Sequence, residues 1–163
     1  MAMEHRGFSL IELIVVMSVL AILASVVTIN FNNWQRKYNI ESQVREMLSD
    51  FSDVRVRAIQ TKTKQRVVLN PTSYSFTPYS TETALSARVV FTKNLKYPIQ
   101  QLTTSGLTAF NNTALEIDER GYTTNWMSIA VAAGMNEPSL NCLAVSWARV
   151  NMGRVNGNTC EFK

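Results

Sequence analysis

The sequence predicts an α+β protein, in which one long N-terminal helix is followed by a domain built on an antiparallel β-sheet. The first observation is a stretch from residue 8 to residue 60. Its first half is almost entirely apolar, and in its second half the apolar residues recur at helical spacing and form one stripe. The second is the change after residue 61 to short alternating or β-branched segments, which are typical of strands. Such an order places the C-terminal half of the helix on the sheet.

The first half of the predicted helix is almost entirely apolar. Between Leu13 and Ile29 the sequence has no charged residue, and only two serines and one threonine interrupt the apolar side chains. A helix over residues 8–31 is about 36 Å long, which is enough to cross a hydrocarbon layer of roughly 30 Å. We therefore expect residues 8–31 to form a transmembrane helix.

One acidic residue, Glu12, lies near the start of this apolar run. Placing an acidic side chain in a bilayer costs about 2.5–3.5 kcal/mol on insertion scales, so Glu12 indicates a partner of opposite charge. The nearest candidate is the α-amino group that a cut after Gly7 would leave on Phe8. An ion pair between the Phe8 amine and Glu12 of a neighbouring subunit would also fix the axial register, a well-attested use of buried polar groups.

Residues 7–12, Gly-Phe-Ser-Leu-Ile-Glu, and the apolar run behind them resemble the N-terminus of type IV prepilins and type II secretion pseudopilins. The resemblance implies that prepilin peptidase removes residues 1–7 as a leader, that Phe8 is N-methylated, and that Glu12 becomes the fifth mature residue. A secretory signal cut near residues 21–24 is an alternative, but it leaves the acid without a role. Another alternative is a protein with a single membrane span that keeps its leader, which would include an enzyme.

The same resemblance implies a location and a set of partners. The positively charged leader stays cytoplasmic, so residues 32–163 would form a periplasmic domain anchored in the bacterial inner membrane. The chain would then enter a pilus or pseudopilus, whose core would consist of packed helices over residues 8–31. Its partners would be other pilin or pseudopilin subunits, prepilin peptidase, the inner-membrane assembly platform and membrane lipid. Many major pilins carry a glycine and a proline where this chain has Ala21 and Ile29, which favours a minor subunit.

The second half of the predicted helix, residues 32–60, contains neither glycine nor proline. Its apolar residues recur every three or four positions and form one stripe, widened by Trp34, Tyr38 and Leu48. The stripe itself consists of Ile40, Val44, Met47, Phe51, Val54 and Ala58. We expect this stripe to pack on the sheet; an isolated coiled coil is the alternative.

Eight strands are expected in the rest of the chain. They are residues 66–70, 73–78, 87–92, 114–118, 122–125, 128–133, 140–146 and 149–152, and residues 94–112 are expected to be loop with short strands. The first two strands flank Asn-Pro-Thr-Ser and read as a hairpin. Residues 118–121 read as a turn in which Gly121 takes a positive φ, and residues 135–139 read as a second turn.

The C-terminal part resembles, more loosely, the GspH/FimT-like group of minor pseudopilins and minor pilins. In that group a strand with a glycine turn, here LEIDERGYT, precedes a closing strand with a Gly-Arg motif, here LAVSWARVNMGRVNGNTC. Ala148 replaces the motif glycine and Asn151 the second arginine. Some members contact DNA through this motif, so Arg149 and Arg154 are candidates for DNA contact, with a solvated strand edge as the alternative.

Composition restricts the remaining functions. A net charge of +4 over 163 residues does not by itself indicate nucleic-acid binding. Cys142 and Cys160, in a domain outside the cytoplasm, predict one disulfide. The single histidine, His5, belongs to the expected leader, so the mature chain has no histidine for a triad or a zinc site. We expect no catalytic residue, no metal and no cofactor, and therefore a structural subunit.

Two further groups of residues each allow two interpretations. Trp126 and Trp147 could mark a partner surface, because tryptophan is enriched at binding hot spots, or they could fill the core of the domain, which we favour. Glu116, Asp118 and Glu119 lie close enough for a calcium loop. Their order lacks the D-x-D-x-D-G pattern, and a turn explains them.

Overall fold

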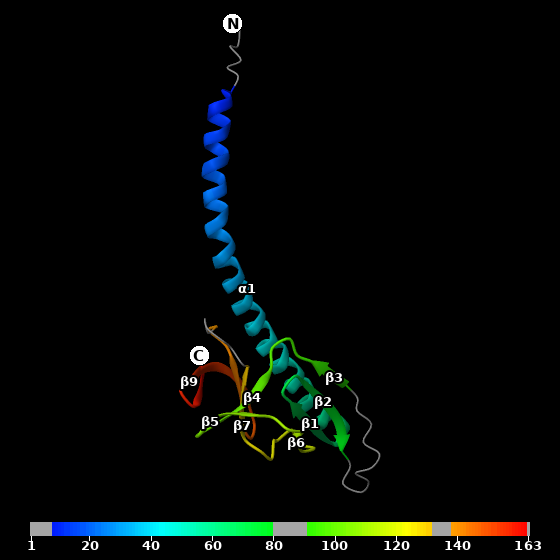
Figure 1. The fold of residues 1–163 in the computed structure, drawn as a ribbon. Helices are drawn as coiled ribbons and strands as arrows, with labels where there is room; N and C mark the ends of the chain where they lie inside the picture. The colour runs from blue at the N-terminus through cyan, green and yellow to red at the C-terminus, as the bar shows by residue number, and fades with distance from the viewer. Residues whose placement is uncertain (1–7, 80–90, 132–137, 163) are drawn as a thin grey trace. The chain divides into compact units, whose positions relative to one another are not determined.

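The computed structural model describes residues 8–79, 91–131 and 138–162, without the side chains of residues 26–30. Within this part of the chain one helix is followed by ten strands (Figure 1). The chain forms two compact units, Met1–Arg36 and Lys37–Lys163. The predictions for the leader, for residues 87–90 and 132–133, and for most of the turn at residues 135–139 lie outside the described residues.

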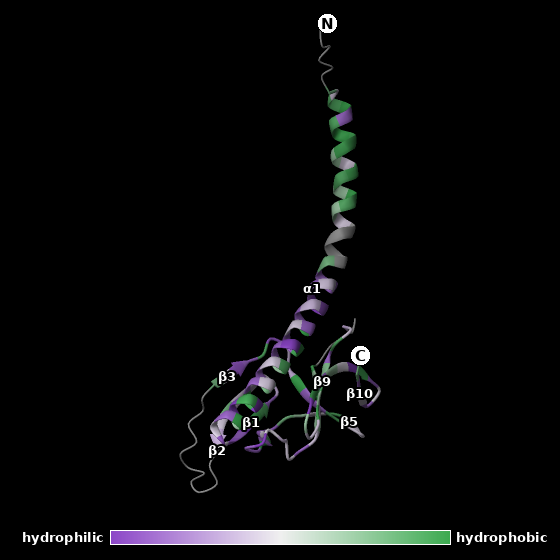
Figure 2. Cartoon of the chain, turned by 180° about the vertical axis from the view of Figure 1, so that it is seen from behind, coloured by the Kyte–Doolittle hydropathy of each residue, from purple (hydrophilic) through white to green (hydrophobic). Residues whose placement is uncertain are grey.

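The helix α1 (Leu10–Thr61) begins in the first unit. The carbonyl oxygen of Ser9 accepts a hydrogen bond from the backbone N–H of Leu13 at 3.2 Å, which makes Ser9 the N-cap. Glu12 lies in the first turn, where the positive end of the helix dipole stabilises a carboxylate. The side chains from Phe8 to Ser25 are all exposed, and most are apolar (Figure 2). No helix in the described part of the chain has both the length and the hydropathy of a membrane span.

The second half of α1 buries the predicted stripe in the second unit. All six of its members are buried, and Leu48 packs against them: Ile40, Val44, Met47, Phe51, Val54 and Ala58. The prediction that Trp34 and Tyr38 belong to the stripe is wrong, because both side chains are exposed. They precede Ile40, which is the first residue of the core.

The first sheet has the strand order β3-β2-β1-β6 and is antiparallel throughout. Its strands are β1 (Lys64–Asn70), β2 (Ser73–Tyr79), β3 (Phe91–Asn94) and β6 (Thr113–Ile117). Asn70 pairs with Ser73, so the predicted hairpin at Pro71 is confirmed. Burial alternates along β1, which gives the sheet one face for the core.

The second sheet has the order β10-β9-β8-β7-β4-β5 and is also antiparallel. Its strands are β4 (Ile99–Thr103), β5 (Gly106–Ala109), β7 (Met127–Val131), β8 (Cys142–Val145), β9 (Val150–Asn156) and β10 (Thr159–Phe162). Strand β10 was not predicted, although the two-residue loop before it contains Gly157 at φ 57°, a common hairpin signal. The strand predicted at 122–125 is absent, and only Thr123 forms an isolated bridge, to Ile117.

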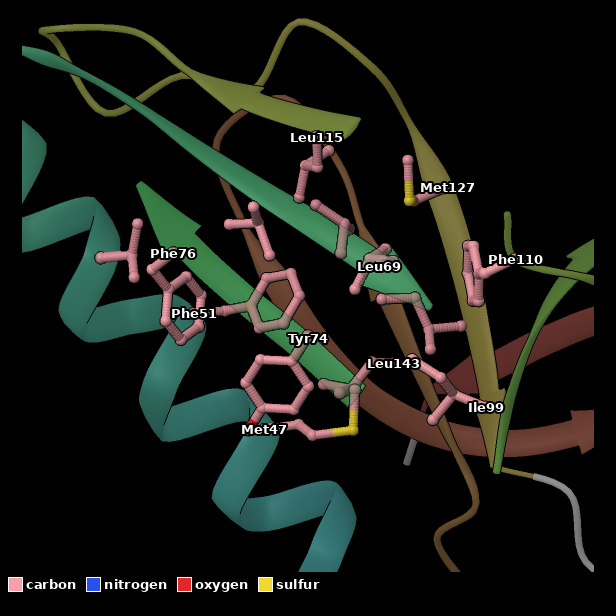
Figure 3. Close-up of a cluster of buried hydrophobic side chains, with 14 of the residues drawn as sticks. Met47, Phe51, Leu69, Tyr74, Phe76, Ile99, Phe110, Leu115, Met127 and Leu143 are labelled. Atoms are coloured by element: carbon pink, nitrogen blue, oxygen red, sulfur yellow. The ribbon is translucent and has the colours of Figure 1, made fainter. Parts of the chain in front are cut away.

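One hydrophobic core joins α1 to both sheets (Figure 3). The ring of Phe51 on α1 lies 6.1 Å from that of Tyr74 and 6.2 Å from that of Phe76, both on β2. Ile99 of β4 and Leu143 of β8 bring the second sheet into the same cluster. The prediction of an α+β fold, with a long helix packed on antiparallel sheet, is therefore confirmed.

Candidate functional site

The N-terminal end of α1 carries one carboxylate on an exposed apolar surface. Phe8, which precedes the helix, and the neighbours of Glu12 on both sides, Ile11 and Leu13, are all exposed. Among the described residues, no lysine or arginine forms an ion pair with Glu12. The predicted cleavage residue Gly7 lies outside the described residues.

The other polar side chains of this segment are satisfied within the helix. The Ser18 hydroxyl donates to the carbonyl oxygen of Ile14 at 2.7 Å, and the Ser25 hydroxyl donates to that of Ile22 at 2.7 Å. Hydroxyl groups bonded in this way need no water, so they tolerate an apolar environment. A carboxylate cannot be satisfied by backbone carbonyls, because it has no proton to donate. In the described segment from Leu10 to Ser25, Glu12 is therefore the side chain whose burial requires a partner.

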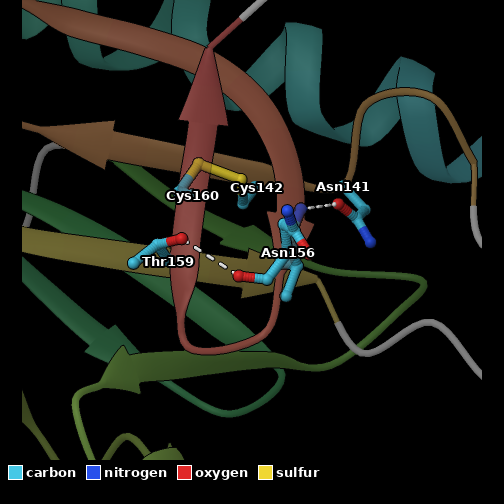
Figure 4. The surroundings of a disulfide bond; sticks show 6 residues. Asn141, Cys142, Asn156, Thr159 and Cys160 are labelled. Atoms are coloured by element: carbon cyan, nitrogen blue, oxygen red, sulfur yellow. Dashed lines mark hydrogen bonds between the residues drawn. A yellow bond between two sulfur atoms is a disulfide. The ribbon is translucent and has the colours of Figure 1, made fainter.

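A disulfide joins Cys142 of β8 to Cys160 of β10, with a Cα–Cα distance of 6.0 Å (Figure 4). The bond crosses β9, which lies between the two strands. A side chain at Gly153, the β9 residue opposite Cys142, would collide with the backbone oxygen of Glu161. Gly153 is therefore required by the close approach of β10. Next to the disulfide, the Oδ1 of Asn141 accepts a hydrogen bond from the backbone N–H of Val155 at 2.7 Å and so attaches β9 to the start of β8.

The structure does not bring the two candidate DNA-contact residues together. Arg149 is the last residue of the β8–β9 turn, and its carbonyl oxygen accepts the backbone N–H of Ser146 at 2.9 Å. Arg154 lies on β9 directly opposite Glu161 of β10. The two arginines are five positions apart in the sequence, and the residue paired with Arg154 is acidic. Contact of Arg149 and Arg154 with DNA stays a prediction.

Both tryptophans of the domain lie on the surface, so the prediction that they fill the core is wrong. Trp126 is 76% exposed and Trp147 is 60% exposed. Trp126 comes just before β7, and Trp147 lies in the β8–β9 turn, so neither is on a strand that faces the helix. The ring of Tyr122 lies 5.1 Å from that of Trp147. An open groove of about 320 Å³ is lined by Asp118, Tyr122, Thr123, Thr124, Trp126 and Trp147.

Two acidic residues near this groove, Glu116 and Asp118, take part in local structure. Glu116 forms an ion pair with Arg66 at 2.7 Å. One carboxylate oxygen of Asp118 accepts the backbone N–H groups of Arg120 and Tyr122, at 2.9 and 2.7 Å. Gly121 has a φ of 83°, so the predicted glycine turn is confirmed. The described residues contain no cluster of three potential metal ligands.

Two titratable side chains connect α1 to the sheets. The Tyr74 hydroxyl donates to Asp50 at 2.5 Å, and burial together with the neighbouring Asp50 carboxylate raises the pKa of Tyr74. Burial lowers the pKa of Arg55, whose Nη1 donates to the carbonyl oxygen of Ala148 at 2.6 Å. This bond fixes the β8–β9 turn, and with it Trp147, against the helix.

Comparison with known proteins identifies the N-terminal segment. Residues 3–28 match the family described as the prokaryotic N-terminal methylation motif. No curated protein and no solved structure matches the chain. The matched motif is typical of type IV pilins and pseudopilins, and it implies processing by prepilin peptidase and assembly with pilin subunits into a pilus or pseudopilus. It therefore indicates a structural subunit that is anchored in the inner membrane before assembly.

Proposed function

We propose that this chain is a minor subunit of a type IV pilus or a type II secretion pseudopilus. Prepilin peptidase would cut after Gly7, and Phe8 would then be N-methylated. Residues 8–31 would anchor the subunit in the inner membrane and later pack in the filament core, with residues 32–163 outside the cytoplasm. The observation that carries the proposal is the match of residues 3–28 to the methylation motif.

The chemistry of the first helical turns supports assembly through an ion pair between subunits. The apolar side chains from Leu10 to Leu23 give neighbouring helices a surface to pack on. In that apolar packing the Glu12 carboxylate and the Phe8 amine would each be costly to bury alone and would compensate one another as a pair. Subunits would therefore be held in the register that brings the two charges together.

Two features support a minor position for this subunit. The helix α1 continues without interruption from Leu10 to Thr61, through Ala21 and Ile29, where many major pilins have helix-breaking residues. The C-terminal strands carry the loose resemblance to minor pseudopilins described above. A place at the filament tip, or in the initiation of assembly, rests on this resemblance alone.

The first test is the mass of the mature N-terminus, measured by mass spectrometry on protein from cells that possess prepilin peptidase. We expect a chain that begins at Phe8 and carries one methyl group. Cells that lack the peptidase provide the control and should yield the chain with residues 1–7 attached. An intact N-terminus in both strains, or a cut near residue 24, would contradict the proposal.

The second test separates membrane insertion from assembly. Glu12→Ala removes a polar cost, so the variant should insert as well as wild type, but it should be recovered less in sheared filaments. Glu12→Gln keeps the shape of the side chain and should show the same loss, because only the charge is removed. Ser18→Ala is the matched control, because Ser18 lies in the same exposed segment and its hydroxyl is bonded only to its own helix, at the carbonyl oxygen of Ile14. Recovery of Glu12→Ala equal to that of Ser18→Ala would refute the ion pair.

A further inference from the structure

The groove beside the β8–β9 turn is the most unusual surface of the domain. Three aromatic residues line it, Tyr122, Trp126 and Trp147, and two of them are among the most exposed aromatic side chains of the described second unit. Large aromatic side chains normally gain stability by burial, so a shared groove of such rings is typical of a binding surface. The groove lies on the second unit and includes no residue of the N-terminal motif.

The rings are held in place by the backbone around them. Thr123 donates its hydroxyl to the carbonyl oxygen of Ser146 at 2.8 Å and its backbone N–H to that of Trp147 at 2.9 Å. Arg55 holds the other side of the same turn through Ala148 at 2.6 Å. The Tyr122 and Trp147 rings therefore belong to segments that are tied to each other and to α1, and this side of the groove is preorganised.

The polar groups of the groove leave one charged acceptor available. The hydroxyls of Thr123 and Thr124 already donate to backbone carbonyl oxygens. Asp118 uses its Oδ1 for two backbone N–H groups, whereas its Oδ2 has no hydrogen-bond donor among the described residues. Asp118 is the charged residue among those that line the groove. The groove therefore presents aromatic rings and one carboxylate oxygen.

No arginine or lysine is among the described residues that line the groove. The Arg55 guanidinium is directed to the Ala148 carbonyl, its Nη2 is buried, and it does not line the groove. The adjacent Glu119 and Arg120 carry opposite charges and are exposed in the turn. Aromatic faces are electron-rich and attract cations, and tryptophan does so most strongly. A carboxylate beside such faces adds a charge-assisted hydrogen bond to the same cation.

We propose that the groove binds a cationic side chain, arginine or lysine, presented by a partner protein. The cation lies against the ring of Trp126 or Trp147 and donates to Oδ2 of Asp118. A nucleic acid is the wrong partner, because its phosphates would face a carboxylate and the negative faces of the rings. A neutral saccharide could stack on the rings, but its binding would depend little on the charge of Asp118.

The test is a titration of the full-length protein in detergent micelles, followed by NMR of the tryptophan indole N–H groups. The probe is an acetylated and amidated Gly-Arg-Gly-Arg-Gly peptide, and the matched control peptide carries glutamine in place of arginine. We expect saturable shifts of the Trp126 and Trp147 signals with the arginine peptide alone. The signal of Trp34, which belongs to the other compact unit, is the internal control and should not move.

Two variants decide which groups bind the cation. Asp118→Asn keeps the oxygen that holds the turn and should weaken binding about two- to fivefold, the range measured for exposed ion pairs. Trp126→Ala should weaken it by a similar factor and cannot disturb the core, because the side chain is largely exposed. Equal binding of both peptides, unchanged affinity in both variants, or no shift with arginine would overturn the proposal. So would shifts with maltohexaose or a DNA duplex in place of the arginine peptide.

Discussion

Reducing the Cys142–Cys160 disulfide should destabilise the second unit without changing its fold. Among the described strands, β10 is one of the two edges of the second sheet and pairs only with β9. The disulfide is its second attachment, since it reaches across β9 to the buried Cys142 of β8. Once the bond is reduced, β10 keeps its ladder with β9, so the native sheet remains possible while the unfolded chain becomes less restricted.

The size of the effect follows from the length of the closed loop. The two cysteines are 18 positions apart. In the chain-entropy relation a loop of that length restricts the unfolded chain by about 11 cal/mol/K, which corresponds to about 3 kcal/mol at 25 °C. Domains of this size have unfolding free energies of about 5–15 kcal/mol, so the loss is a large fraction of the total. With a urea m-value of about 1–3 kcal/mol/M, the urea midpoint should fall by about 1–3 M.

The assay is urea unfolding of the full chain in micelles, with and without reductant, followed by near-ultraviolet circular dichroism. A Cys142→Ser/Cys160→Ser double variant is the control, because its midpoint should be low from the start and insensitive to reductant. Two results would refute the reasoning: a wild-type midpoint that reductant leaves unmoved, or a reductant effect of equal size in the double variant.

Three further substitutions test the core, the pH dependence and the glycine turn. Phe51→Ala should cost about 3–5 kcal/mol in urea unfolding, because the ring is 1% exposed and contacts two other buried aromatic rings. Because the pKa of Tyr74 is raised in the folded state, the stability it contributes is fully present below pH 10 and is lost as the pH rises further. Unfolding free energies measured from pH 9 to 12 should fall by up to about 1.4 kcal/mol per pH unit more in wild type than in Tyr74→Phe. Gly121→Ala should cost about 1–3 kcal/mol by thermal unfolding, because the residue has a φ of 83° and its new Cβ would lie 2.8 Å from the Ile59 side chain.

The sequence was most informative where apolar residues recur at the regular spacing of a helix or a strand. The stripe from Ile40 to Ala58 keeps a helical spacing over several turns, and its burial followed as predicted. The hairpin of β1 and β2 was predictable for a similar reason, since alternating segments flank a turn at Pro71. In both cases neighbours in sequence determine the result, and distant parts of the chain only supply the surface to pack against.

Features that depend on distant parts of the chain were predicted poorly. The sequence does not show that the strands divide into two sheets, because the pairing of β4 with β7 joins segments far apart in the chain. Trp126 and Trp147 have large apolar side chains of the kind that usually fills a core. They are exposed because one lies just before β7 and the other lies in the β8–β9 turn. Strand β10 could have been found from the Gly157 hairpin signal, but its close approach to β9 depends on Gly153 and the disulfide.

Residues of the C-terminal half of α1 stabilise the fold, whereas residues of the N-terminal half are expected to act in assembly. In the C-terminal half the apolar side chains are buried in the core of the second unit, so Phe51→Ala changes the free energy of unfolding. In the described N-terminal segment the apolar side chains and Glu12 are exposed, so their substitution removes no contact within that core. Glu12→Ala should therefore leave the urea midpoint unchanged and lower filament recovery. A conservative Phe51→Leu substitution should instead lower the urea midpoint. A midpoint that falls in Glu12→Ala would mean that the carboxylate stabilises its own chain, as a first-turn acid can, and that its role is not confined to assembly.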